Sequence, residues 1–133
     1  MSVFVNGFRW VMVVSGVLTC TMFYAAFAPV ASLQSNFGEV LDGPLAQILV
    51  RNWGVLIGLV GLMLIYGAFS VANRRLVLLV AMASKVAFIA LVLTFGQQFL
   101  QFQVGTAVIV DSVMVVLFVL YLVAARRSGA GSA

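Results

Sequence analysis

Four long apolar runs dominate the chain, and short segments between them hold most of the polar residues. The runs cover residues 10–27, 48–69, 76–95 and 104–123. A helix rises about 1.5 Å per residue, so about 20 apolar residues cross a hydrocarbon core about 30 Å thick. Each run is long enough to cross the hydrocarbon core, and the first is at the short end of the range. The pattern predicts an all-α fold: an integral membrane up-down four-helix bundle that forms a single domain over residues 1–127, followed by a flexible tail at 128–133.

The connections between the runs carry turn signals. Pro29 ends the first run, because proline lacks an N–H and biases Ala28 away from helical angles. In the long first connection, Leu33 and Phe37 recur at helical spacing with polar residues between them. That spacing fits either a short amphipathic helix on the membrane surface or a plain surface loop. The second connection is a tight turn, so the second and third runs should be antiparallel neighbours.

Composition supports a membrane protein and excludes an ordinary soluble domain. Of the 133 residues, 65% are hydrophobic and 8% are charged, and the mean hydropathy is +1.24. A soluble domain has too little interior to bury so much apolar surface. The basic residues are scattered over helix ends without aromatic residues between them, so we expect no nucleic-acid partner.

The charges outside the runs predict the topology. Glu39 and Asp42 lie in the first connection, whereas five arginines lie at the N-terminus, in the second connection and at the C-terminus. By the positive-inside rule, both termini are cytoplasmic, and we expect a multi-pass protein of a bacterial inner (cytoplasmic) membrane. Anionic lipid head groups are the expected partners of these arginines. They are Arg9, Arg74, Arg75, Arg126 and Arg127.

Three charged residues fall inside the runs: Arg51, Asp111 and Lys85. Counted from the outer helix ends, they lie about 5, 10 and 15 Å deep, with Lys85 near the midplane. A lone charge there costs about 2.5–3.5 kcal/mol, which a nearby opposite charge offsets. Asp111 is the only acidic residue within a run. We therefore expect Lys85 and Asp111 to face each other in the bundle interior with Arg51 above them, while Asn52 either joins this charged core or caps its helix.

The charged core has two interpretations. It either fixes the register of the helices as a buried ion pair, or lines a polar cavity that opens to the outer side and binds an anionic or amphiphilic ligand. Arg51 has a further alternative, because an arginine one turn inside a boundary commonly extends to lipid phosphates.

Gly54, Gly58 and Gly61 form a stripe of small residues along the second run. Small residues let helices approach closely, so the stripe marks either a packing seam within the bundle or a homodimer face. The first interpretation is favoured, because the four helices must pack on one another.

Residues that carry catalytic or cofactor chemistry are sparse. The sequence has no histidine and a single cysteine, Cys20, which excludes histidine-ligated haem, a CxxC redox couple and thiolate metal clusters. We find no nucleophile paired with a base and no phosphate-binding glycine loop. We therefore expect no cofactor, no metal site and no catalytic residue, and an enzyme is the less favoured class.

One stretch resembles a known group of proteins. The segment APVASLQSNFG, followed by VRNWGVLIGLVGLMLIYGAF, is similar to DoxX-like and related uncharacterised families of small bacterial four-helix inner-membrane proteins. There too, a proline-ended first helix leads to an arginine-bearing, glycine-rich second helix. Some DoxX-like proteins are accessory subunits of membrane redox systems, so the resemblance implies quinone or partner binding by analogy. It implies no catalytic residue.

These features predict a non-catalytic membrane protein, an accessory or assembly subunit that binds a larger membrane complex or a second copy of itself. One alternative is a small transporter or a binder of a lipophilic or anionic ligand that uses Arg51, Lys85 and Asp111. Another is an accessory subunit of a quinone-linked redox system. A glycine-rich helix face favours the first function, and a wet, outward-open cavity containing both cations favours the second.

Overall fold

The computed structural model describes residues 2–39, 41 and 43–128, and every element in them is helical. Four helical stretches are long and apolar enough to cross a membrane: Val3–Phe27, Pro44–Phe69, Val71–Phe95 and Gln103–Arg127. The chain is therefore an all-α, four-helix, multi-pass membrane protein, which confirms the predicted fold class. The predicted flexible tail lies outside the described residues except for Ser128, which ends the last helix.

The first span consists of three consecutive segments: α1 (Ser2–Cys20), the 3-10 turn η1 (Thr21–Phe23) and α2 (Tyr24–Phe27). Ala28 interrupts the helix with φ −134° and ψ 69°, and α3 (Pro29–Phe37) begins at the proline. The other spans are α4 (Pro44–Phe69), α5 (Val71–Phe95) and α6 (Gln103–Ser128), with the 3-10 turn η2 (Gln97–Phe99) before α6.

The helices are longer than the apolar runs that predict them. Three predicted ends coincide with helix ends, at Phe27, Phe69 and Phe95, but all four helices begin before their runs. Apolar runs report only the part of a helix that needs to match the hydrocarbon core. Backbone hydrogen bonds continue into the polar flanks, where water and head groups also tolerate a helix.

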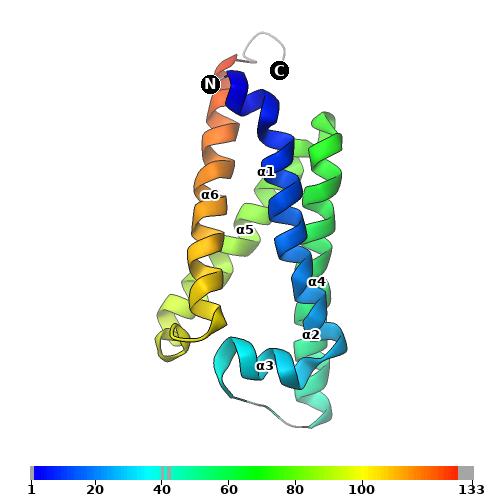
Figure 1. Ribbon diagram of the computed structural model, residues 1–133, viewed down its shortest axis with the longest axis vertical. Helices are drawn as coiled ribbons and strands as arrows, with labels where there is room; N and C mark the ends of the chain where they lie inside the picture. The colour runs from blue at the N-terminus through cyan, green and yellow to red at the C-terminus, as the bar shows by residue number, and fades with distance from the viewer. Residues whose placement is uncertain (1, 40, 42, 129–133) are drawn as a thin grey trace.

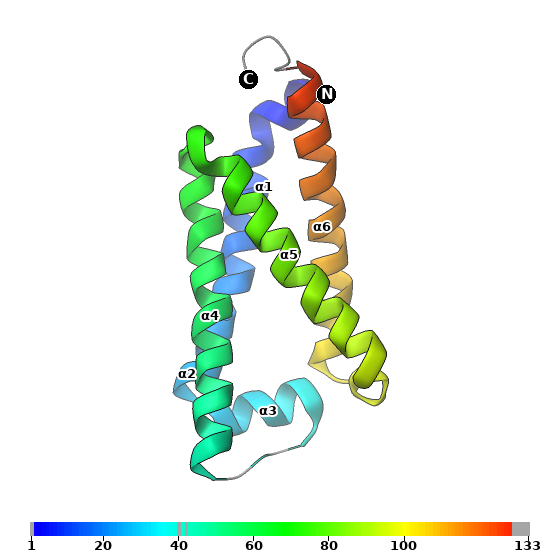
Figure 2. The same cartoon turned by 180° about the vertical axis from the view of Figure 1, so that it is seen from behind.

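The start of α1 and the end of α6 lie at one end of the bundle, which we call the terminal end, and α3 lies across the opposite end (Figure 1). The first span and α4 run side by side, whereas α5 crosses obliquely from the end of α4 to the far end of α6 (Figure 2). The spans therefore diverge towards α3. Of the two alternatives for the first connection, the structure contains the helix.

One face of α3 packs onto the bundle, and that face includes polar residues. Ser32 and Asn36 are buried beside Leu33. The helix ends at Gly38, whose φ of 71° is left-handed and suits glycine. A β-carbon at Gly38 would also overlap the ring of Phe102, which precedes α6. This contact holds the end of α3 against the start of α6.

The glycine stripe is a packing seam within the chain. A β-carbon built at Gly54 would lie 2.7 Å from the carbonyl oxygen of Met22, and one at Gly61 would lie 2.6 Å from the backbone nitrogen of Cys20. Gly58 is equally close to a phenylalanine ring of the first span. Any larger residue would push the first span away from α4.

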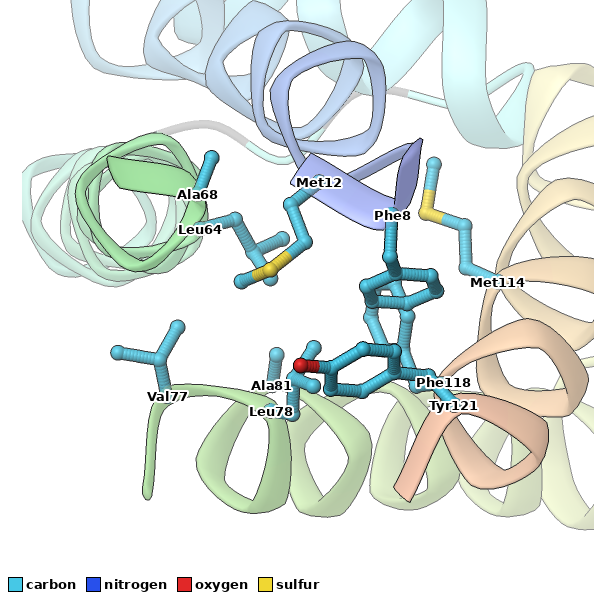
Figure 3. Packing of buried hydrophobic residues seen from close by; sticks show 10 residues of the cluster. All are labelled: Phe8, Met12, Leu64, Ala68, Val77, Leu78, Ala81, Met114, Phe118 and Tyr121. Atoms are coloured by element: carbon cyan, nitrogen blue, oxygen red, sulfur yellow. The ribbon is translucent and has the colours of Figure 1, made fainter. Parts of the chain in front are cut away.

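The half of the bundle near the terminal end is filled by a core cluster of apolar side chains from all four spans (Figure 3). The ring of Phe8 stacks on Tyr121 with centroids 4.2 Å apart and meets Phe118 edge-on at 6.0 Å. The cluster consists of Phe8, Met12, Leu64, Ala68, Val77, Leu78, Ala81, Met114, Phe118 and Tyr121.

Arg74 is a charged residue within this packed half, and it is only 7% exposed. Its guanidinium donates to the carbonyl oxygens of Gly67 and Ala68, at 2.9 and 2.6 Å, and to the hydroxyl of Tyr121 at 3.1 Å. Carbonyls in the last turn of a helix lack intrahelical donors and carry partial negative charge. Arg74, predicted to contact lipid head groups, is thus corrected to a residue that caps α4, because its side chain folds back onto these carbonyls.

Replacing Arg74 by glutamine should destabilise the bundle, because the capped carbonyls lose their charged donor. Hydrogen bonds to charged groups contribute about 1.5–3 kcal/mol, so the melting temperature of the detergent-solubilised protein should fall clearly. Arg75→Gln removes the same charge from an exposed side chain one residue away and should leave the melting temperature unchanged. Equal melting of the two variants would contradict the capping role.

Candidate functional site

A cavity of about 780 Å³ lies between the spans in the half of the bundle nearer α3. Its lining residues belong to α3, which contributes Ser35 and Asn36, and to the four spans, which diverge towards α3 in Figures 1 and 2. Most of its surface is apolar, with walls that include Ile57, Phe88 and Val110.

Lys85 and Asp111 meet at the inner part of this cavity. The ammonium nitrogen Nζ of Lys85 lies 2.8 Å from Oδ1 of Asp111 and joins α5 to α6. The turn between these helices explains the encounter, because Lys85 stands ten residues before Phe95 and Asp111 eight residues after Gln103. In antiparallel neighbours, similar distances from the turn give similar depths.

Thr19 of α1 is the third member of this site. Its hydroxyl oxygen accepts a hydrogen bond of 3.3 Å from Lys85 Nζ. The same hydroxyl donates to the backbone carbonyl of Ser15 at 2.7 Å. Since its proton is directed at the backbone, the oxygen lone pairs of Thr19 face the ammonium group. The lysine is thereby held between α1 and α6.

The two charged side chains differ in how accessible they are. The side chain of Lys85 is 6% exposed and that of Asp111 is 19% exposed. Within the described chain, only Oδ1 of Asp111 receives a hydrogen bond, and no buried side-chain oxygen lacks a partner. The second carboxylate oxygen, Oδ2, is therefore accessible, and because Asp111 lines the cavity, it is the free polar atom of the pair.

Arg51 and Asn52 do not join the pair. Both side chains are exposed and neither lines the cavity, so the predicted charged core is corrected to Lys85 and Asp111. The Arg51 guanidinium donates instead to the carbonyl oxygen of Ala26, at the end of the first span. The physical reason is rotation: Arg51 shares a helix face with Gly54, and that face turns towards the first span.

The candidate site predicted from the sequence lacks the polar residues that other elements bring to the cavity, above all Thr19 and Asn36. Asn36 is buried, and its amide donates to the carbonyl oxygen of Ser32 at 2.9 Å. A signal was present at Thr19, because a hydroxyl in an apolar run must find a partner inside the bundle. At Asn36 no such signal was present, because both alternatives for the first connection, a surface helix and a surface loop, place its polar residues in water.

Comparison of the chain with protein-family models, with curated proteins and with solved structures finds no match. The resemblance to DoxX-like proteins therefore stays a prediction.

Removing one member of the ion pair should cost more stability than removing both. Lys85→Met leaves an unpaired carboxylate, and breaking a buried pair costs about 3–5 kcal/mol, whereas replacing both charges by apolar groups is often neutral. The double variant Lys85→Met/Asp111→Leu should therefore melt above Lys85→Met and close to the wild-type protein. Thermal unfolding of the three proteins in one detergent measures this coupling. A double variant that melts at or below the single variant would contradict it.

Proposed function

We propose that this multi-pass membrane protein binds a lipophilic small molecule in the cavity between its spans. The observation that carries the proposal is the cavity itself. Its volume of about 780 Å³ falls in the range of about 300–1,000 Å³ found for ligand sites. It combines mostly apolar walls with a limited number of polar groups, among them Thr19, Lys85 and Asp111 at its inner part and Ser35 and Asn36 at the end near α3, which is the usual composition of such sites.

The cavity has one closed end, which favours binding over free passage. On the side of the terminal end, the core cluster fills the bundle, and Met114 belongs both to that cluster and to the cavity wall. The space is therefore a pocket and not a continuous pore. Transport through the bundle would require the packed half to separate.

The same proposal places both termini in the cytoplasm of a bacterial inner membrane. Its support is the distribution of exposed charges. Arg75 lies near the start of α5, and Arg126 and Arg127 lie in the last turn of α6, whereas Glu39 follows α3, which lies across the opposite end of the bundle (Figure 1). In that orientation, the cavity lies in the outer half of the membrane, and anionic lipids surround the exposed arginines.

An accessory or assembly role, alone or in a quinone-linked redox system, stays a prediction. That interpretation drew on the glycine stripe, and the stripe contacts the first span of the same chain. Binding to a membrane-protein partner or to a second copy would use another surface.

Filling the cavity should remove the ligand without unfolding the protein. Ala107 of α6 lines the cavity, whereas Val113 of the same helix is 54% exposed on the outside. Native mass spectrometry of gently solubilised wild-type protein should show a bound lipophilic molecule. Ala107→Phe should lose it and Val113→Phe should keep it, with the melting temperatures of both variants close to wild type.

Two outcomes would contradict the binding function. One is a wild-type protein that carries no small molecule after gentle extraction. The other is equal occupancy in Ala107→Phe and Val113→Phe, which would place the bound species on the outer surface of the bundle.

A further inference from the structure

We infer that the cavity recognises its ligand through a neutral hydrogen-bond donor, a hydroxyl or an amide N–H, which binds Oδ2 of Asp111. This inference rests on the proposed function and names the chemical class of the ligand. It differs from the expectation of an anionic ligand held by cations.

The first step is the accessibility of the two charged groups. The ammonium of Lys85 is already bonded to Asp111 and Thr19, and its side chain is only 6% exposed. Oδ2 of Asp111 is accessible and accepts no hydrogen bond from the described residues. A molecule entering the cavity therefore meets the carboxylate oxygen. An ionised carboxylate only accepts hydrogen bonds, so the complementary ligand group must donate one.

The second step is charge balance. Lys85 and Asp111 are the charged residues of the described cavity lining, and their formal charges cancel. A charged ligand would leave one charge unbalanced in a site of low dielectric constant, which is costly. A second cation in the site, such as Arg51, would balance the charge of an anionic ligand. Arg51 instead donates to the carbonyl oxygen of Ala26 and does not line the cavity. A neutral donor satisfies the free oxygen and keeps the site neutral.

The third step is the shape of the space beyond the pair. On α6, Asp111 stands eight residues from Gln103, which corresponds to about 12 Å along the helix. Both residues line the cavity, whose surface is mostly apolar through side chains such as Ile57 and Phe88, with the polar Ser35 and Asn36 of α3 also in the lining. The ligand class is therefore an elongated apolar molecule with a neutral donor at its inner end.

Three probes with similar apolar chains separate the possible head groups: decanol, decyl methyl ether and decanoate. Binding to the full chain is measured by native mass spectrometry at matched probe concentrations. Decanol should bind about ten- to one-hundred-fold more tightly than the ether, which is the difference expected for one hydrogen bond to a charged group. Decanoate should bind no better than the ether.

The double variant Lys85→Met/Asp111→Leu tests whether Asp111 causes the preference. It leaves no unpaired charge, and unchanged ether binding would show that its cavity is intact. Decanol should bind this variant only as tightly as the ether does. Ser112→Ala is the matched control, because Ser112 adjoins Asp111 but bonds to the carbonyl of Val108 outside the lining. It should keep the wild-type preference for decanol.

Each other outcome overturns a distinct statement. Equal binding of decanol and the ether to the wild-type protein would overturn the donor inference and leave the binding function standing. Tighter binding of decanoate than of decanol would overturn it in favour of an anion held by Lys85. A preference for decanol that persists in the double variant would remove Asp111 from recognition. Absence of binding by all three probes would overturn the donor inference together with the proposed function.

Discussion

An ammonium and a carboxylate placed among apolar side chains each carry a desolvation penalty, which a close contact between the two opposite charges offsets. Lys85 and Asp111 meet this constraint with a contact of 2.8 Å that joins α5 to α6, and the hydrogen bond to Thr19 extends the connection to α1. Three spans thus converge on polar atoms halfway along the bundle. The rest of the interior divides at this point into a packed half and an open half.

Two different kinds of helix contact produce that division. Along the seam of Gly54, Gly58 and Gly61, the first span and α4 approach as closely as backbone allows. At the terminal end, large side chains fill the centre, and Arg74 closes α4 with two hydrogen bonds to its carbonyls. At the end near α3, the helices α5 and α6 diverge from the first span and α4. The cavity lies between these two pairs of helices. The ion pair lies at the boundary between the two halves. Lys85 is buried there, and Oδ2 of Asp111 is accessible from the cavity.

The sequence predicts both the helices and the contact between Lys85 and Asp111. Counting residues along a helix gives the length of each span and the depth of each charged residue in the bundle. The sequence does not predict rotation about the helix axis, since these helices are apolar on nearly every face. Arg51 shows the consequence. Its depth predicted that it would join the charged core, but it lies on the same face of α4 as the glycine seam and donates to the carbonyl oxygen of Ala26 in the first span. Arg74 shows another limit, because a long side chain at a turn can fold back onto the preceding helix. The buried position of Asn36 depends on where α3 lies, which only the tertiary structure determines.

Cysteine labelling would show whether water reaches the interior of the bundle beside the ion pair. With Cys20 replaced by alanine, the chain has no thiol, and a cysteine placed at Ser84 would line the cavity while one at Val86, which is 51% exposed, would face lipid. In membranes, a water-soluble maleimide should label Ser84→Cys, and adding Ala107→Phe should slow that labelling, while Val86→Cys should stay unlabelled. If Ser84→Cys were as unreactive as Val86→Cys, the bundle would have no accessible cavity beside Lys85 and Asp111, which would contradict both the site and its binding function.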